Sequence, residues 1–319
     1  MALELTQAQI ITELRGHIGD SADSFADRAL SRATITGLAR LARRRDWSWF
    51  RDTFPCASTV PYSTGTVAIN IGSTTVTGDV TVFPSTVVSG GAWIEFAGQT
   101  RAYEITVRTS DTSITIRNAY ANADAANLAS ASYRIFYPSI DLPANFKKLR
   151  TTSRCSGVLD DGRNSDLDIV MDADLLDAHA AYASVGAPHC GAIRPKRNDP
   201  NIFQLWMYPP PNTVETYTVL YHRVPGWYST STVATATFTV EPVTTSYFLD
   251  WPKNHKDLYL ASCKLSMAAD GVKGLDYGMV RDEYQELLRA AESDDERQPE
   301  VEYLGQGNGP RRESWRIGV

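Results

Sequence analysis

The sequence predicts an α+β protein: a helical-bundle core with a β-hairpin region, an inserted small all-β domain (a sandwich or barrel) and an extended C-terminal arm. Three observations lead to this prediction. Apolar residues recur at helical spacing near both ends of the chain, and short β-type runs separated by glycine and aspartate fill the middle. The last residues combine acids, glycines and arginines without apolar periodicity.

Length and composition suggest more than one compact part. The chain has 319 residues, which exceeds the size at which a single hydrophobic core usually stops growing. Its 43% hydrophobic and 21% charged residues are typical of globular proteins. We expect residues 1–57 and 138–292 to form the helical core, 58–137 the inserted β-domain, and 293–319 the arm.

Residues 1–54 read as two helices. Thr6 and Gln9 have capping-box spacing, and Ser24 is a suitable N-cap for a longer second helix, with Asp27 at its third position. The residues expected to face inward are Ile10, Ile11, Leu14, Ile18, Leu30, Ile35, Leu38 and Leu41.

The second helix ends in arginines and then aromatic residues. Cations suit a helix C-terminus, and we expect the aromatic residues to pack in the core. The arginines could also contact DNA phosphate or a neighbouring subunit, or form salt bridges within the protein, and the sequence leaves these options open. The arginines are Arg40, Arg43, Arg44 and Arg45, and the aromatic residues are Trp47, Trp49 and Phe50.

From about residue 55 to 137 the composition changes to serine, threonine and valine, with no lysine. Short strands punctuated by glycine indicate a small all-β domain, inserted into a helical host. The expected strands are Thr66–Ile71, Thr74–Thr77, Ala92–Phe96, Ala102–Val107, Ser113–Arg117 and Ser132–Tyr137.

After the insertion, the sequence predicts mixed structure and then two closing helices. Alternating runs at 202–208 and 214–223 flank three prolines and favour a β-hairpin, and a short helix is expected at 173–184. Pro252 opens a helix to about Asp270. A last helix begins near residue 276, and its apolar stripe is Tyr277, Val280, Tyr284, Leu287, Leu288 and Ala291.

The sequence contains no motif of a known catalytic or nucleotide-binding site, so we expect no enzyme activity and no cofactor. His179, His189 and Cys190 fit no common zinc spacing. The acidic cluster in residues 160–174 lacks the order of an EF-hand loop, and a metal-dependent hydrolase built on it is the weakest alternative. Four widely spaced cysteines are expected to be reduced thiols.

The net charge of −6 argues against a dedicated nucleic-acid-binding protein, although local basic patches remain compatible with it. No apolar run reaches the roughly 18 residues that a membrane span needs. The first residues have no basic and apolar segments of a signal peptide, so we expect synthesis in a cytosol and no membrane partner.

The order of elements resembles the head-to-tail adaptor (connector or tail tubular) proteins of tailed bacteriophages. The helical hairpin ends in the run at 43–50, the β insertion contains 91–96 and 132–136, and the return segment Asp141–Leu149 is the strongest part of the resemblance. A later segment with three prolines, Pro209–Pro211, and two closing helices complete it. The resemblance covers about residues 5–292.

This resemblance implies a virion protein of the head–tail neck, assembled in the host bacterial cytoplasm, that forms a ring of about twelve copies around the DNA channel. The implied partners are the portal protein, tail nozzle or tail fibre/spike proteins, other copies of the chain and, non-specifically, packaged DNA. We expect the arm to bind the portal, because aromatic residues and arginines often dominate interfaces. The arm residues are Tyr303, Leu304, Arg311, Arg312, Trp315 and Arg316.

Five tryptophans are further expected anchors for interfaces: Trp47, Trp49, Trp206, Trp227 and Trp251. An alternative from another class is a carbohydrate- or receptor-binding β-module on a helical scaffold. An exposed aromatic platform in residues 58–137 would favour it, but Trp93 and a few tyrosines are the only candidates there.

Overall fold

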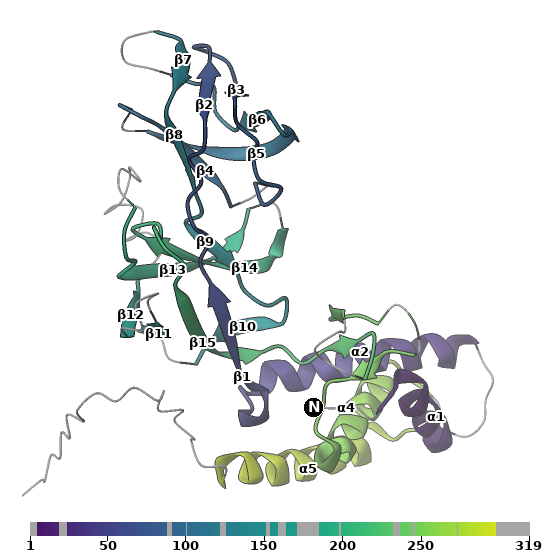
Figure 1. Cartoon of the computed structure of the whole chain (residues 1–319). Coiled ribbons are helices and arrows are strands. Elements are labelled where there is room, and N and C mark those ends of the chain that lie inside the picture. Colours follow the sequence, from purple (N-terminus) through teal and green to yellow (C-terminus); the bar gives the residue numbers. More distant parts are fainter. Residues whose placement is uncertain are drawn as a thin grey trace, which may run out of the picture. The chain divides into compact units, whose positions relative to one another are not determined.

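The structure is a computed structural model and has a mixed α+β fold, with four α-helices in its described part and several antiparallel sheets (Figure 1). It describes residues 5–18, 24–87, 91–99, 101–121, 126–150, 154–158, 164–170, 185–197, 199–231, 237–242, 244, 246–272 and 274–297.

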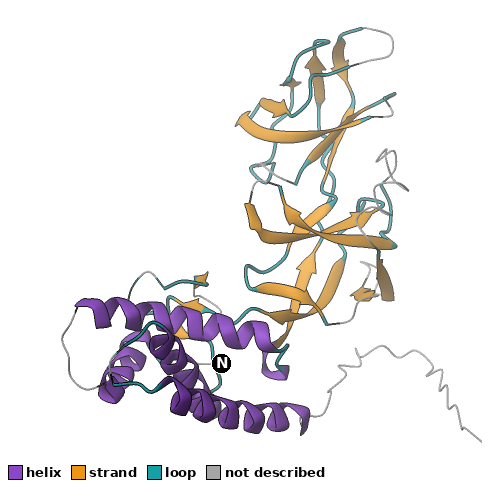
Figure 2. Ribbon diagram, turned by 180° about the vertical axis from the view of Figure 1, so that it is seen from behind, coloured by secondary structure: helices purple, strands orange, loops and turns teal. Residues whose placement is uncertain are grey.

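The chain divides into two compact units. The helical unit combines Met1–Phe54, Leu142–Thr151 and Leu220–Pro299, and the β unit contains Pro55–Asp141 and Thr152–Val219. The helical unit is therefore built from both ends of the chain, whereas the β unit comes from its middle. Figure 2 colours the helices purple and the strands orange, and all four described helices belong to the helical unit.

The helical unit contains four helices and a small sheet. Helix α2 packs against α4, α4 packs against α5, and α1 contacts both α2 and α4. The helices are α1 (Gln7–Ile18), α2 (Ser24–Arg44), α4 (Lys256–Ala269) and α5 (Tyr277–Arg297), with 3₁₀ turns η1 (Ser48–Phe50) and η3 (Lys253–His255). The three-stranded sheet has the order β17 (Phe238–Thr239), β16 (Trp227–Tyr228) and β18 (Phe248–Leu249).

Local signals define the helix ends much as the sequence predicts. The capping box is confirmed, since the Thr6 backbone N–H donates to Gln9 Oε1 at 2.9 Å and the Gln9 N–H donates to Thr6 Oγ1 at 3.3 Å. Asp276 caps α5 by accepting the Met279 N–H at 2.9 Å. Gly271 and Gly274 adopt positive φ after α4, as expected where a helix must end. The proposed Ser24 cap lies outside the described side chains.

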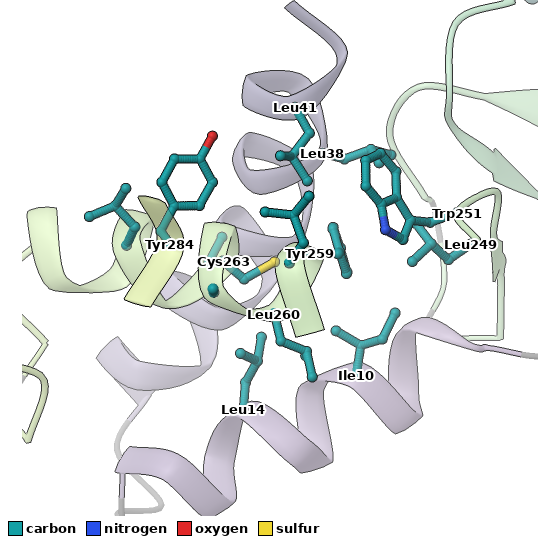
Figure 3. Packing of buried hydrophobic residues seen from close by; sticks show 14 of the residues in the cluster. Ile10, Leu14, Leu38, Leu41, Leu249, Trp251, Tyr259, Leu260, Cys263 and Tyr284 are labelled. Atoms are coloured by element: carbon teal, nitrogen blue, oxygen red, sulfur yellow. The ribbon is translucent and has the colours of Figure 1, made fainter. Parts of the chain in front are cut away.

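One hydrophobic core joins the four helices (Figure 3). Ile10, Leu14 and Leu260 pack beside Tyr259 and Cys263 in this view. Helices α2 and α4 approach closely: a Cβ on Gly37 would lie 2.8 Å from Cys263 Sγ. Burial raises the pKa of that thiol to about 12, so it stays protonated at neutral pH.

The aromatic cluster after α2 belongs to this core, as the sequence predicts. Trp47 and Trp49 stack with ring centroids 4.6 Å apart, and Trp251 meets Trp47 edge to face at 6.3 Å. Trp47 donates its indole N–H to the Leu41 carbonyl at 3.0 Å. The expectation that Trp47, Trp227 and Trp251 anchor interfaces is wrong, because these side chains are buried inside their own unit.

All six strands expected in the insertion are present, and they form a curled seven-stranded antiparallel sheet with one strand that was not predicted. The sheet order is β7-β2-β3-β6-β5-β4-β8. Its strands are β2 (Thr66–Ile69), β3 (Thr75–Asp79), β4 (Trp93–Phe96), β5 (Ala102–Ser110), β6 (Ser113–Ile116), β7 (Leu128–Ala131) and β8 (Tyr133–Phe136). The unpredicted strand is β7, whose sequence LASA lacks the β-branched residues that usually mark strands.

The second large sheet has the order β1-β15-β11-β12-β13-β14-β9, with β10 also paired to β15. All its pairs with a described register are antiparallel except the parallel pair of β12 and β13. The strands are β1 (Arg51–Ala57), β9 (Ser139–Asp141), β10 (Phe146–Leu149), β11 (Arg154–Val158), β12 (Asn164–Ile169), β13 (Cys190–Lys196), β14 (Asp199–Tyr208) and β15 (Thr216–Arg223).

The predicted β-hairpin is wrong. Both of its strands exist as β14 and β15, but β11, β12 and β13 lie between them in the sheet. The connection contains Pro209, Pro210 and Pro211, which have no backbone N–H to continue a ladder around a tight turn. The helix expected at 173–184 lies outside the described residues.

Candidate interaction surface on the helical unit

Helix α2 places its C-terminal arginines along the closing helices. Arg40 and Arg44 are four residues apart and so lie on one face of the helix. Arg40 Nη1 donates to the Ser262 carbonyl of α4 at 2.8 Å, and Arg44 Nε pairs with Glu292 of α5 at 3.1 Å. These arginines tie the second helix to both closing helices.

Arg45 forms an ion pair with a buried carboxylate of α5. Its Nε lies 2.9 Å from Asp295 Oδ2, and the other carboxylate oxygen accepts the Ser48 backbone N–H at 2.6 Å. The Asp295 side chain is only 4% exposed, so its charge depends on these two donors. Arg45 also reaches Glu296 at 3.1 Å, but that carboxylate is 68% exposed.

Three of the four arginines predicted as contacts for DNA or a neighbouring subunit therefore make bonds within the helical unit. This is the salt-bridge alternative that the sequence left open. Arg43 differs, because it is exposed and forms no ion pair with the described part of the chain. Contact with DNA stays a prediction for all four.

A second group of charges lies at the end of α2. Lys147 Nζ donates to the Ala42 carbonyl at 2.8 Å, which places a cation at the helix C-terminus, and it pairs with Asp46 at 2.8 Å. Lys148 also binds Asp46. Partial burial raises the pKa of Asp46, but the hydrogen bonds and charges of the two lysines outweigh burial and hold it at about 2.

An open groove of about 1090 Å³ is lined largely by residues of α2. Its apolar part includes Ile35, Leu38 and Val240, and Tyr284 of α5 lies at one side. The remaining lining residues are Thr36, Ala39, Arg40, Ala42, Arg43, Arg44, Lys147, Val224, Pro225 and Glu241. Four of these side chains are cationic and one is a carboxylate, so the groove combines apolar surface with positive charge.

Burial beside the groove also changes the pKa of Tyr284. Desolvation raises the pKa of its phenol, while Arg40 and Arg44 oppose that shift and Glu292 adds to it. The phenol is therefore neutral at physiological pH and lines the groove as an uncharged side chain.

In the β unit, the loop after β3 exposes two valines. Val80 is 90% exposed and has φ of +53°, a backbone conformation that is strained for a β-branched residue, and Val82 is 62% exposed. Thr81 between them is buried, and its hydroxyl lies within hydrogen-bond distance of the Thr64 and Thr66 carbonyl oxygens. The loop therefore holds its apolar side chains outward on a fixed base.

Most of the other residues predicted to form sites lie outside the described part of the chain. Tyr303, Leu304, Arg311, Arg312, Trp315 and Arg316 lie outside the described residues. So does His179, while His189 packs edge to face on Tyr208. No group of His, Cys, Asp and Glu that could hold a metal occurs among the described residues.

Helix α5 continues through Ser293–Arg297, past the point where the arm was expected to begin. Sequence reasoning assigned this acidic run to the extended arm and missed the Asp295 ion pair and the groove residues at 224–225 and 240–241. One signal was present: an acidic run after an apolar stripe mirrors the basic run at the end of α2.

No helix in the described part of the chain is long and apolar enough to cross a membrane. Comparison with protein-family models and with curated proteins found no match to this chain.

Proposed function

We propose that this protein is a structural head-to-tail adaptor of a tailed bacteriophage. Copies of it would form a ring of about twelve subunits between the portal and the tail, around the DNA channel. In this proposal the chain carries out no catalysis and needs no cofactor. It binds the portal, its own copies and a tail nozzle or tail fibre/spike protein.

The observation that carries the proposal is the way the helical unit is assembled. Two N-terminal helices and two C-terminal helices share one core, with a long β region between them in the sequence. This is the arrangement that the resemblance implies for an adaptor, in which a rigid helical body carries an added β-domain.

The β unit suits contact with a tail protein. Val80 and Val82 give it an exposed apolar pair on an anchored loop, which a partner surface can cover without reordering the loop. The edge strand β7 is short and carries a register shift, features that oppose non-specific pairing of sheet edges.

The carbohydrate-binding alternative receives less support. Among the described residues of 58–137, every aromatic side chain is buried or partly buried. Trp93 is half-buried and meets Trp206 edge to face, with centroids 6.3 Å apart. Arg194 covers the other tryptophan ring at 4.0 Å, so this pair is occupied by the protein itself.

The test is native mass spectrometry and negative-stain microscopy of the protein with and without its cognate portal. We expect a ring on the portal vertex, and mostly monomer when the portal is absent, since an interface ordered by a template can be weak in isolation. A tight dimer that ignores the portal would contradict the proposal.

A further inference from the structure

The groove on α2 is an open surface feature of the helical unit with no occupant from the described part of the chain. Its lining includes cations at 43, 44 and 147 and apolar side chains at 35, 38 and 240. Arg43 can bind an anion without giving up an ion pair within the described chain. The groove therefore fits a segment with acidic residues on one side and apolar residues on the other.

Such a segment follows α5 in the sequence. Acidic and larger apolar residues alternate over 300–303 in the run Glu300-Val301-Glu302-Tyr303-Leu304, and Leu304 adds one more apolar residue. In an extended chain, alternate side chains point to opposite faces, so Val301 and Tyr303 would face one way and the two glutamates the other. Pro299 ends the helical pattern just before this run, which favours the extended form.

The path of α5 indicates whose groove the segment enters. Tyr284 lines the groove, Glu292 meets Arg44, and Glu296 meets Arg45 beyond it. The helix thus passes its own groove and ends beyond it, beside Arg45 at the end of α2.

We propose that the α2 groove of one copy binds residues Glu300–Leu304 of a second copy. Val301 and Tyr303 pack on the apolar floor, and Glu300 and Glu302 pair with Arg43 and the neighbouring cations. Glu241 is the one lining residue that opposes these acids.

A contact between a groove on one copy and a segment elsewhere on the next is head-to-tail. Contacts of this kind close into rings when the rotation between copies allows it. The inference deepens the proposed function and rests on it for the presence of several copies side by side.

The test is disulfide trapping between two singly substituted full-length chains, one carrying Ala39→Cys and the other Val301→Cys. Ala39 lines the groove, and cysteine is close to alanine in size. We expect a mixture of the two chains, alone or with portal, to form a 39–301 disulfide between copies. A chain with Arg32→Cys is the matched control, because Arg32 is exposed on α2 but does not line the groove.

Arg43→Glu in the groove-bearing chain should slow trapping by about fivefold, whereas Arg32→Glu should not change it. A 39–301 disulfide that forms only within a doubly substituted chain, or trapping no faster than in the Arg32→Cys control, would overturn the inference. If rings still form on the portal in that case, the proposed function survives and only the groove assignment fails.

Discussion

Two hydrophobic cores in the described part of the chain are built in opposite ways. The core of the helical unit joins residues from Ile10 to Ala291, so it needs both ends of the chain. The core of the seven-stranded sheet lies entirely within residues 62–137. A core made from one continuous segment can form before the rest of the chain is present, whereas the helical core must close a long loop first. The difference predicts that the two cores unfold separately.

The largest expected effects come from deleting one aromatic side chain in each core. Trp47→Ala should cost the helical unit about 3–5 kcal/mol, because it removes a buried indole and its hydrogen bond. Phe96→Ala should cost the seven-stranded sheet a similar amount, since this ring is fully buried against Tyr103 and Tyr120.

Thermal unfolding followed by circular dichroism, with helix and strand signals read separately, is the measurement. Each substitution should lower the transition of its own unit and leave the other within experimental error. A single transition that moves with both substitutions would show that the two cores unfold together.

Asp295 should show the next largest effect. Asp295→Ala removes the acceptor of the Ser48 N–H and leaves the partly buried Arg45 with the exposed Glu296, which we expect to cost about 2–3 kcal/mol. Glu296→Ala is the matched control, because that carboxylate pairs with the same arginine but is exposed, and it should cost under about 1 kcal/mol. Urea unfolding of both variants measures the difference, and equal costs would contradict a buried role for Asp295.

The sequence predicted the features that depend on neighbouring residues, and it did not predict those that depend on contacts between distant segments. Thr6 and Gln9 identify a helix start, and the six strands of the insertion show in their own residues, because capping and alternation are local signals. β14 pairs with β13, the strand directly before it, which the sequence analysis did not predict, and β15 pairs with the more distant β11. The hairpin prediction failed because the strand at 190–196 was missed and because the pairing of β15 depends on residues far away in the sequence.

The interaction surface was harder to predict than the fold. Arg40, Arg44 and Arg45 stand out in the sequence, but their partners lie on closing helices more than two hundred residues away. Five tryptophans were assigned to interfaces by residue type, and burial corrects this for Trp47, Trp227 and Trp251. Charge matching between the end of α2 and the end of α5 was the only sequence signal for the contact.

A smaller effect is expected at the strained loop of the β unit. Val80→Gly removes the left-handed strain of a β-branched residue but adds freedom to the unfolded chain, so we expect a gain of up to about 1 kcal/mol. Val82→Gly, in the same loop, brings no relief of this kind and should lower stability slightly. Denaturant midpoints of the two variants test this, and a loss of stability for Val80→Gly would show that the strain is not relieved.

The smallest effect is the pH dependence that Asp46 gives to the helical unit. Its folded-state pKa of about 2 lies below the ordinary value of 3.8, so its ion pairs with Lys147 and Lys148 stabilise the folded state above pH 3.8. This contribution is lost as the pH falls from 3.8 towards 2. Urea midpoints of the helical transition should fall less steeply over that range in Asp46→Asn than in the parent chain, and parallel curves would contradict the assignment.

The most direct test of the contrast between the two cores is to replace residues 58–137 with a short Gly/Ser linker. If the helical core depends only on the chain ends, the remaining protein should keep a cooperative, helix-rich transition, and the excised segment should fold by itself. The Trp93–Trp206 contact and the ion pair of Glu104 with Arg197 cross between the two sheets of the β unit, so some loss of strand signal from the second sheet is expected. Retention of the helical transition, measured by circular dichroism, is the predicted result. Its disappearance would contradict the account and show that the inserted sheet is part of the fold of its host.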